Sequence, residues 1–276
     1  MTAPWRGGSD GAEAAPTPVI DTSVPHPARR YNYWLGGKDN FAADRESGDK
    51  IAAVYPPIRT AALANRRFLE RAVAFLAEQG VGQFLDIGTG IPVSPNTHEI
   101  AQEIRAGARV VYVDNDPIVL SHARALLTSA PGGMTAYLDA DMREPEALLS
   151  DPALRKVLDL DAPVAILLIS VLHFAPDARA IVGPLLDAVP AGSYIALTHL
   201  SKDLLTPDVA AQTDAVNQRS GVEMWFRGRD AIEGLVDGLE ILPPGVVPVA
   251  EWRPVDDPAE RPTPDQASLF ALIARK

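Results

Sequence analysis

Short apolar runs alternate along this chain with longer stretches in which apolar residues recur at helical spacing. The runs at 83–88, 109–114, 163–170 and 193–200 predict β-strands, and a further strand ending at Asp141 fits between the second and third of them. Strands that alternate with helices are typical of a parallel sheet covered by helices on both faces. The run at 163–170 is apolar throughout, so we place it in the centre of the sheet.

Several helical stretches carry signals for their ends. One begins at Asn65, its predicted N-cap, and ends at Gly80. Another begins at Asn96, where Glu99 three residues later completes a capping box, and the next begins at Asp116. The last two helices supply the long crossovers that parallel strands require.

The last part of the chain predicts a different arrangement. Residues 201–239 predict helical segments with a loop near Ser220, and the apolar runs at 246–252 and 268–275 predict an antiparallel pair at one edge of the sheet. The expected fold is therefore an α/β, doubly wound, mostly parallel seven-stranded sheet. It carries an antiparallel C-terminal hairpin and an N-terminal helical or lid segment.

Length and composition bound the organisation of the chain. Its 276 residues, 47% of them hydrophobic, suffice for one large α/β domain with an accessory segment. We therefore divide the chain into a flexible tail at 1–20, the lid and helical segment at 21–80, and the α/β domain at 81–276. The tail is rich in Gly, Ala and Pro and offers little to bury.

Charge and missing residue types exclude several classes of function. With 36 acidic and 25 basic residues the formal net charge is −11, which disfavours nucleic acid and anionic membranes as partners. The absence of cysteine excludes disulfides and thiolate chemistry, and the histidines and carboxylates do not cluster at metal-ligand spacing. Neither a membrane-spanning run nor a secretory signal is apparent, so we expect a cytoplasmic monomer or homodimer without a metal.

The first predicted strand ends in residues suited to ligand binding, because ligands of open α/β sheets bind beyond the carboxyl ends of the strands. It ends in Asp86, followed by Gly88, Thr89 and Gly90. The glycines let backbone approach a ligand closely, and the Asp86 carboxylate can order the loop or meet an ammonium group. An ordinary tight turn between strand and helix is the alternative explanation of this loop.

Acidic residues also end the next two strands. Asp114 ends the second strand, where a carboxylate can accept hydrogen bonds from both ribose hydroxyls of a nucleoside. Asn115 either assists Asp114 or fills the turn. At the end of the third strand, Asp141 is placed to receive an exocyclic adenine amine and Met142 to pack on the ring. Together these residues predict an adenosine site.

The other end of the ligand distinguishes NAD from S-adenosylmethionine (SAM). A pyrophosphate needs a helix N-terminus directly behind the glycine loop. Here Val93 occupies the position of the third fingerprint glycine, and prolines delay the helix until the N-cap at Asn96. The zwitterionic methionine end of SAM needs Asp86 and backbone amides instead. We therefore predict SAM as the cofactor and keep an NAD-dependent oxidoreductase as a weaker alternative.

With these motifs the sequence resembles the class I SAM-dependent methyltransferases, and within them a bacterial subgroup of S-adenosyl methyltransferases whose acceptor is not defined. The resemblance rests on blocks in one order: HPARRYNYWLGGKDNFAADRE, FLDIGTGIPVSPNTHEIAQ, VVYVDNDPIVLSHARALL, YLDADMREPEALL and VAILLISVLHFAPD. It implies the Rossmann-like strand order of that class and a SAM-binding domain at 81–276. It also implies that Ser170 and Val171 form the floor near the sulfonium.

A general base is optional in methyl transfer from SAM, because the positive sulfur already activates the methyl group and alignment is the main requirement. If the acceptor must lose a proton, His173, just after the fourth predicted strand, is the best-placed candidate. A structural hydrogen-bonding role is the alternative for His173, and His199 is a weaker second candidate. His98 and His122 fit the surfaces of helices.

The polar and aromatic block at 31–40 is the feature least explained by packing. We predict a lid that closes over the SAM pocket and helps to select the acceptor. Its candidate residues are Tyr31, Asn32, Tyr33, Gly36, Gly37, Lys38 and Asn40. The alternative is an N-terminal strap that caps the sheet. Residues 223–229 are a second candidate for acceptor contacts, with core packing as the alternative.

The sequence therefore predicts a SAM-dependent methyltransferase that acts on an unidentified small-molecule acceptor. The alternative from a different class is a catalytically inactive protein that binds SAM or S-adenosylhomocysteine (SAH) and regulates a partner. The two differ in whether a methyl group leaves the cofactor, which the residues named above do not decide.

Overall fold

The structure is a computed structural model, and it describes residues 20–119, 121, 129–255 and 257–276. The flexible tail predicted for residues 1–20 lies outside these residues except for Ile20, and so does His122. The account that follows concerns the described residues.

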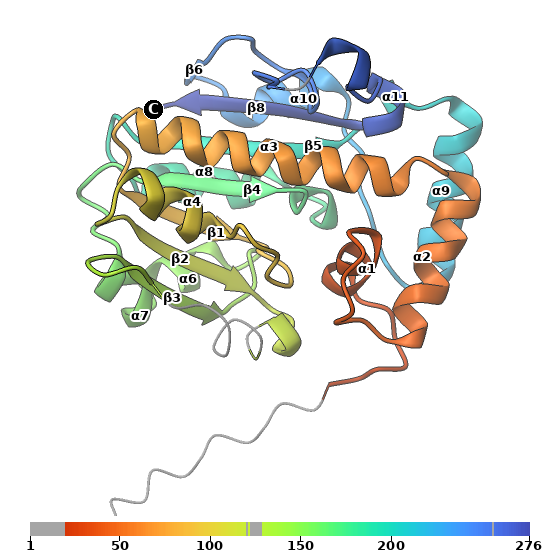
Figure 1. The fold of residues 1–276 in the computed structure, drawn as a ribbon, viewed down its shortest axis with the longest axis horizontal. Coiled ribbons are helices and arrows are strands. Elements are labelled where there is room, and N and C mark those ends of the chain that lie inside the picture. The colour runs from red at the N-terminus through yellow and green to blue at the C-terminus, as the bar shows by residue number, and fades with distance from the viewer. Residues whose placement is uncertain (1–19, 120, 122–128, 256) are drawn as a thin grey trace, which may run out of the picture.

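A mixed, eight-stranded sheet forms the centre of the molecule (Figure 1). Its strand order is β3-β2-β1-β4-β5-β8-β6, and β7 pairs with β8. The strands β1 to β5 are parallel, whereas β8 runs antiparallel to β5, β6 and β7. The strands are β1 (Gln83–Ile87), β2 (Arg109–Asp114), β3 (Met134–Asp139), β4 (Ala165–Ile169), β5 (Tyr194–Leu200), β6 (Glu240–Ile241), β7 (Val247–Pro248) and β8 (Leu269–Arg275).

This sheet confirms the predicted doubly wound, mostly parallel architecture with an antiparallel C-terminal part. The predicted hairpin is present as β7 and β8, and the two-residue strand β6 adds a further partner for β8. The third strand is shorter than predicted, because it ends at Asp139 and not at Asp141. The chain turns there: the Asp141 carboxylate accepts a hydrogen bond from the backbone amide of Arg143, and its carbonyl accepts one from Glu144.

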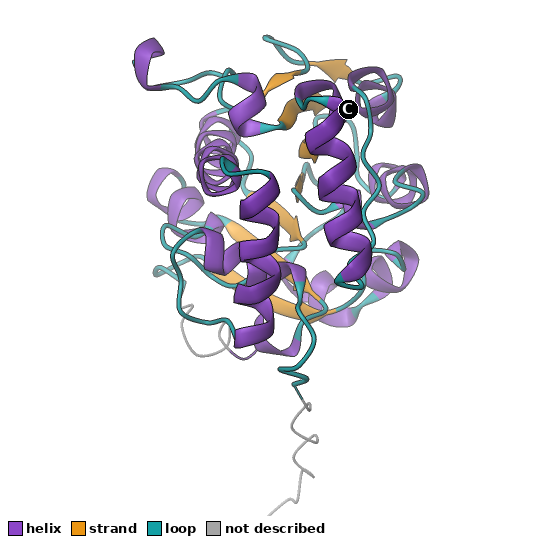
Figure 2. Ribbon diagram, turned by 90° about the vertical axis from the view of Figure 1, so that its right-hand side faces the viewer, coloured by secondary structure: helices purple, strands orange, loops and turns teal. Residues whose placement is uncertain are grey.

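Helices cover both faces of the sheet, as Figure 2 shows with the strands lying between two helical layers. In Figure 1, α3 and α4 lie over one face, and α6, α7 and α8 lie over the other. The described helices are α1 (Pro27–Trp34), α2 (Ala42–Val54), α3 (Ile58–Glu78), α4 (Thr97–Ile104), α6 (Pro145–Ser150), α7 (Pro152–Val157), α8 (Arg179–Asp187), α9 (Pro207–Arg219), α10 (Arg229–Glu233) and α11 (Pro264–Ala267). Residues 117–119 are helical as well.

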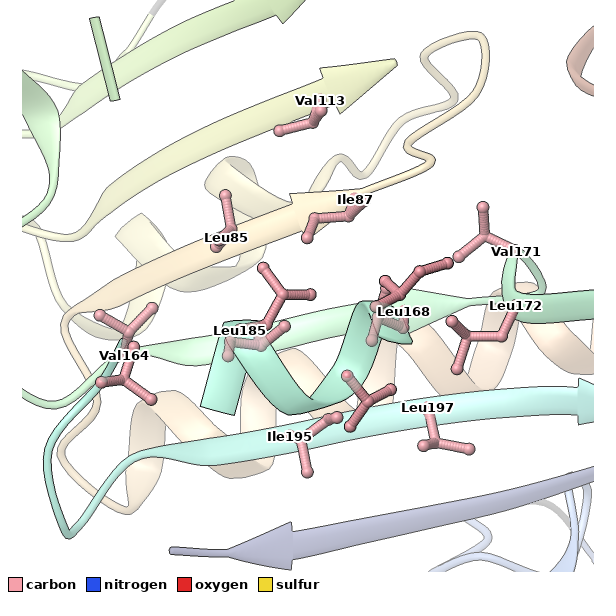
Figure 3. Close-up of a cluster of buried hydrophobic side chains, with 14 of the residues drawn as sticks. Leu85, Ile87, Val113, Val164, Leu168, Val171, Leu172, Leu185, Ile195 and Leu197 are labelled. Carbon is pink, nitrogen blue, oxygen red and sulfur yellow. The ribbon is translucent and has the colours of Figure 1, made fainter. Parts of the chain in front are cut away.

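Two apolar cores hold these layers together. On one face, residues of β1, β4 and α8 such as Leu85, Leu168 and Leu185 are fully buried against each other (Figure 3). On the other face, α3 packs Phe68 and Leu76 against the sheet. Burial of a side chain of this size contributes about 1.5–3 kcal/mol, which fixes the strands and therefore the positions of their carboxyl ends.

The helix α3 differs from its prediction. It begins at Ile58 after Pro57, so Asn65 lies in its second turn and is not its N-cap. The apolar stripe continues upstream through the buried residues Ile58 and Ala61, and the small alanines there hide the helical period in the sequence. The predicted end is confirmed, because Gly80 has the positive φ of +95° that glycine allows after a helix.

The N-terminal helices lie beyond the carboxyl ends of the parallel strands. In Figure 1, α1 lies opposite the tips of β1 and β2, and α2 stands next to α9. α2 also contacts α1 and α3, so α1 is held between the sheet and the helical layer formed by α2 and α9. This arrangement encloses the space at the carboxyl edge of the sheet.

Candidate functional site

A cavity of about 1020 Å³ opens at the carboxyl ends of β1, β2 and β4, where the chain order of the strands reverses. Open α/β sheets bind ligands at this point. All ten predicted cofactor-binding residues line the cavity, and so does His173. They are Asp86, Gly88, Thr89, Gly90, Asp114, Asn115, Asp141, Met142, Ser170 and Val171.

The loop after β1 has the conformation that its glycines permit. Gly88 and Gly90 have φ values of +71° and +68°. A Cβ atom on Gly88 would lie 2.3 Å from a methyl carbon of Val171, so only glycine fits there. The amides of Gly88 and Thr89 both donate to the carbonyl of Val113 on the neighbouring strand, at 2.8 and 3.2 Å. The loop is thus drawn tightly over the end of the sheet, and the helix α4 begins only at Thr97, as predicted.

Asp86 presents a carboxylate that water hardly reaches, since only 5% of the residue is exposed. Its Oδ2 accepts a hydrogen bond of 2.6 Å from the hydroxyl of Thr97. Burial raises the pKa of Asp86 to about 6, and the Thr97 hydroxyl and the charge of Arg66 only partly oppose that rise. A carboxylate so poorly solvated gains from a cationic partner in the cavity, since nearby positive charge favours its ionised form.

Asp114 is held in place by backbone amides. Its Oδ2 accepts from Gly90 at 2.8 Å, and its Oδ1 accepts from Asp116 at 2.9 Å. Burial raises the pKa of this carboxyl group, whereas the two backbone hydrogen bonds lower it. Each carboxylate oxygen retains capacity for another donor, such as a hydroxyl. The bond to Gly90 also ties the end of β2 to the glycine loop.

Asp141 lies at the more exposed end of the cavity. Its carboxylate accepts from the Nε of Arg143 at 2.9 and 3.0 Å, which is the main reason that its pKa lies below the usual value. Asn115 also hydrogen-bonds to Asp141, so it joins the ends of β2 and β3. Met142 packs against the apolar core beside them.

A buried hydrogen-bond chain, which the sequence did not indicate, crosses the cavity wall. The amide of Ser170 donates to Thr198 at 2.9 Å, and the Thr198 hydroxyl donates to Asn65 Oδ1 at 2.6 Å. Asn65 Nδ2 then donates to the Tyr31 hydroxyl at 2.9 Å, and that hydroxyl donates to the carbonyl of Ala62. The chain fixes Ser170, whose φ of +58° is uncommon outside glycine. In the sequence, the only sign of this hydrogen-bond chain is a polar residue within each of two apolar elements, Asn65 in α3 and Thr198 in β5.

His173 lies in the short 3₁₀ turn 172–174 after β4 and is almost fully buried. Its Nδ1 has no hydrogen-bond partner, and burial lowers its pKa well below the usual value. The imidazole is therefore neutral near pH 7. His199 differs, because its Nε2 accepts from Arg227 at 2.9 Å while its Nδ1 donates to the carbonyl of Leu200 at 2.7 Å. Both ring nitrogens of His199 are thus engaged, and the residue does not line the cavity.

His98 is also placed differently from its prediction. It is buried, not on a helix surface, and its Nδ1 lies 2.8 Å from the hydroxyl of Tyr112. The same hydroxyl accepts a hydrogen bond from the backbone amide of His98. The first turn of α4 packs on the sheet through this contact, so His98 positions the helix that follows the glycine loop.

Most of the predicted lid residues do not line the cavity. Of the seven, only Tyr31 lines it. Asn32 instead organises the turn between α1 and α2, because its Oδ1 accepts from Asp39 at 3.1 Å and from Asn40 at 3.0 Å. A Cβ atom on Gly37 would lie 2.2 Å from the Asn32 side chain. The remaining four form no part of the cavity wall: Tyr33, Gly36, Gly37 and Lys38.

In this region the cavity is lined by Tyr31 and Trp34 of the block and by residues upstream of it. These lining residues are Pro25, His26, Pro27, Ala28, Arg30, Tyr31 and Trp34. His26 Nδ1 lies 2.9 Å from Asp116 Oδ2, and Arg29 Nε lies 3.4 Å from the same atom. Burial alone would raise the pKa of Asp116, but His26 and Arg29 hold it below its usual value. These contacts fasten the start of α1 beside Asp114.

The segment 222–226 forms part of the cavity wall, with Met224, Trp225 and Phe226 lining the cavity. The amide of Trp225 donates to the carbonyl of His173 at 2.8 Å. Arg227 donates to backbone carbonyls of Leu172, Ala175 and Pro176. It therefore anchors the segment to the turn that carries His173.

The described ranges hold neither a metal-binding cluster nor a membrane-spanning helix. They contain no group of three or more His, Asp and Glu residues able to hold a metal ion. None of their helices combines the length and apolar character needed to cross a bilayer.

This sheet order, with an antiparallel strand inserted beside β5 and an acidic glycine loop at the reversal point, defines the class I methyltransferase fold. Magnesium protoporphyrin IX methyltransferase from Synechocystis, solved with bound SAH, shares the fold. It is 14% identical, the alignment covers 90% of this chain and 93% of that one, and the TM-score is 0.51.

More similar proteins narrow the class to a family. The family model for S-adenosyl methyltransferases matches residues 13–276, and the chain belongs to this family. A DUF574-family protein from Streptomyces avermitilis is 43% identical over 94% of this chain and 100% of its own, with a TM-score of 0.90. A protein from Thermobifida fusca is 41% identical over 95% and 98%, with a TM-score of 0.85. A search of curated proteins finds no match.

The predicted cofactor SAM is confirmed by this family membership. The residues of the cavity also fit it chemically. A cationic ligand suits the poorly solvated carboxylate of Asp86. At Gly88 a side chain would collide with Val171, so only backbone fits there. Asp114 adds acceptors beside the same loop. The cavity is therefore suited to a ligand that carries both a positive charge and hydroxyl groups.

Proposed function

We propose that the protein transfers a methyl group from SAM to a small-molecule acceptor bound in the same cavity. The supporting observation is that one cavity extends from the glycine loop to an apolar region walled by α1, α3 and the segment 222–226. Its volume of about 1020 Å³ lies at the upper end of the roughly 300–1,000 Å³ usual for a single small ligand. The enclosure thus suits two ligands held side by side.

The cofactor end takes these roles in the proposal. Asp86 meets the ammonium group, Asp114 accepts from the ribose hydroxyls, and Asp141 receives the adenine amine. The glycine loop and Met142 pack against the same molecule, and Ser170 with Val171 forms the floor near the reacting methyl. Bound SAM supplies a methyl group that positive sulfur already activates. The protein contributes alignment, because bringing acceptor and methyl to near-attack distance lowers the barrier most.

His173 is the proposed general base for an acceptor that must lose a proton. Its neutral imidazole can accept a proton, and it lines the cavity just after β4. The lowered pKa makes it a weak base, so it serves best for an acceptor whose own proton is already acidic. A His173→Gln variant should slow transfer to such an acceptor while SAM binding stays within about twofold.

Calorimetry with SAM, SAH and NAD tests the cofactor assignment of the site. We expect SAM and SAH to bind and NAD not to bind, and we expect Asp114→Ala to weaken SAM binding by about tenfold or more, since hydrogen bonds to a charged acceptor contribute roughly 1.5–3 kcal/mol. Asp139→Ala is the matched control, because that carboxylate also ends a strand but does not line the cavity. Equal losses in both variants would contradict the assignment.

Transfer itself is tested with methyl-labelled SAM and a metabolite extract. Label in a low-molecular-weight product supports the proposal, and label in protein or nucleic acid contradicts it. SAM binding without transfer to any fraction would favour the alternative of an inactive SAM- or SAH-binding regulator, which nothing in the comparisons supports.

A further inference from the structure

Arg30 places a guanidinium group inside the protein with no carboxylate to neutralise it. The residue is 2% exposed and lines the cavity. Its Nη1 donates to the hydroxyl of Ser47 and to Oδ1 of Asn217, both at 3.2 Å, and its Nε has no partner. Both partners are neutral, and the ring of Trp34 lies 5.6 Å from the guanidinium carbon. A buried cation of this kind is costly unless an anion pairs with it.

Asp44, the carboxylate whose charge acts on Arg30, is already bonded to other groups. Asp44 on α2 accepts backbone hydrogen bonds from His26 and from Phe41, each at 2.8 Å. It also lies 3.7 Å from Arg29, the neighbour of Arg30. Its charge acts on Arg30 only from a distance, without a hydrogen bond. Protein groups in the described ranges therefore leave the positive charge of Arg30 without a direct anionic partner.

Other polar groups with unused hydrogen-bonding atoms line the same cavity as Arg30. Thr213 lies one turn before Asn217 on α9, lines the cavity, and its buried hydroxyl has no partner. His173 lines the cavity too, also has an unpartnered nitrogen, and is close enough to sense the charge of Arg30. Apolar residues such as Leu205 and Met224 line the same cavity. The region is thus an apolar pocket with one cation and several unused hydrogen-bonding groups.

We infer that the methyl acceptor carries a carboxylate, which Arg30 binds in this pocket. A guanidinium matches a carboxylate in charge and geometry, and a single cation neutralises a singly charged group without leaving excess charge buried. The inference rests on the proposed function, because it assigns the chemistry of the acceptor that shares the cavity with SAM.

The carboxylate of SAM itself is a less suitable partner. The charge of Arg66 acts on Asp86, at the methionine end. Arg30 instead acts on His173 and bonds to α2 and α9. Arg30 therefore belongs to the acceptor end of the cavity, and its loss should leave SAM affinity nearly unchanged.

Paired probes test the inference with SAH bound to the full-length protein. The probes are benzoate, phenylacetate and 3-phenylpropionate, each compared with its neutral primary amide by calorimetry or by competition. We expect the carboxylate to bind about tenfold or more tightly than the amide in at least one pair, which corresponds to a charge-assisted hydrogen bond. Phenyl phosphate distinguishes a dianion from a carboxylate, and its tighter binding would replace the carboxylate with a phosphate as the recognised group.

Variants of Arg30 assign the selectivity to that residue. Arg30→Met should abolish the preference for carboxylate over amide, and Arg30→Lys should retain part of it. Arg59→Met is the matched control, since Arg59 is exposed on α3, stacks on Tyr33 and does not line the cavity. If Arg30 served folding alone, Arg30→Met would lower the stability of the protein without changing the ratio of its affinities for the carboxylate and the amide.

Several outcomes overturn the inference while leaving the proposed function intact. They are SAH binding without carboxylate preference in any pair, no binding by any carboxylate probe, or an Arg30→Met variant that keeps the preference. A loss of SAM affinity in Arg30→Met would assign Arg30 to the cofactor instead. Failure of the unmodified protein to bind SAM or SAH would contradict the proposed function itself. If Arg30→Met does not fold, the affinities of the unmodified protein for carboxylate and amide still test whether the pocket prefers a carboxylate.

Discussion

At the scale of single residues, the buried carboxylate of Asp86 sets the pH range of cofactor binding. Its pKa of about 6 in the folded protein lies above its ordinary value, so below pH 6 the free protein holds it protonated. In our proposal the ammonium group of SAM binds only the ionised form. SAM affinity should therefore fall about tenfold per pH unit below pH 6 and be constant above pH 7. Calorimetry between pH 5 and 8 would measure this.

The same pKa shift acts on the stability of the free protein with the opposite sign. Because protonation is favoured in the folded state, this contribution is fully present below the ordinary pKa of Asp86 and is lost as the pH rises through about 6. Asp86→Asn should remove both effects, leaving weak SAM binding that does not change with pH across this range. A pH profile that is unchanged in Asp86→Asn would assign the titration to another group.

The two glycines of the loop provide a matched pair for a second prediction. Gly88 and Gly90 both have positive φ, but only Gly88 is crowded by Val171. Gly90→Ala should cost about 1 kcal/mol of unfolding free energy from backbone conformation alone. Gly88→Ala should cost about 1–3 kcal/mol more, because the added methyl group collides with Val171. Chemical denaturation of both variants would measure the difference.

A double-mutant cycle checks the cause. Val171→Ala should offset part of the cost of Gly88→Ala, since it removes the methyl carbon 2.3 Å from the added atom. If the costs of Gly88→Ala and Val171→Ala simply add in the double variant, the collision with Val171 is not the cause of the extra cost at Gly88.

Residues at strand ends could be predicted from the sequence because the apolar pattern marks where each strand stops. Asp86, Gly88 and Asp114 follow from that pattern directly, and all line the cavity. Arg30 could not be predicted in the same way. Its environment depends on Ser47 and Asn217, which are far from it in the chain, and a charged residue in a polar segment gives no sign of burial.

At the scale of elements, α3 shows how a helix can be recognised while the position of its key residue is misjudged. Its apolar stripe was visible from Phe68 onward, but its true start at Ile58 was obscured by alanines. Asn65 therefore looked like a cap, although it is 2% exposed in the helix interior. A side-chain amide that is buried in this way needs partners from other elements, and Tyr31 and Thr198 provide them.

The bonds of Asn65 join α1, α3 and β5, so its removal should loosen all three. Asn65→Leu leaves the Thr198 hydroxyl without its acceptor and should cost about 1–3 kcal/mol of unfolding free energy. Leu63→Ala is the control on the same helix, since Leu63 is exposed, and we expect a change within about 0.5 kcal/mol. Denaturation curves would compare them, and a similar small cost in both variants would argue against the proposed link.

The glycine-containing block at 31–40 illustrates a second limit of sequence analysis. Its residues were conspicuous because they are polar, aromatic and flexible, which suits a lid and a structured turn equally well. The contacts of Asn32 with Asp39 and Asn40 identify a turn. Only Tyr31 and Trp34 of the block line the cavity. The rest of the lining from this region lies upstream at 25–30, where the proline and histidine residues gave no pattern that distinguishes a wall from a loop.

At the scale of the whole molecule, the order of strands and helices followed from the alternation of their patterns, because parallel sheets need buried strands and long crossovers. The far wall of the cavity followed only in part. Tyr31 and residues 223–226 belong to segments that the sequence offered as candidates, whereas the contribution of α3 depends on contacts that form only after folding.

The net charge of −11 predicts how the cofactor reaches this cavity. SAM carries a net positive charge near pH 7, whereas SAH is neutral overall, so only SAM is attracted by the field of the protein. Raising the ionic strength from about 20 to about 500 mM should slow SAM association several-fold and leave SAH association nearly constant. Stopped-flow fluorescence can follow both, because Trp34 and Trp225 line the cavity. Equal salt dependence for both ligands would contradict this prediction.

The position of β8 also has a consequence for biosynthesis. This strand follows all the others in the chain, yet it lies between β5 and β6. While a ribosome is still making the preceding residues, β5 therefore presents an open edge, and the pocket lacks the wall that includes Leu269. Unpaired edges of nascent chains invite association with other chains. Until β8 has emerged and paired with β5, the nascent protein should therefore depend strongly on chaperones.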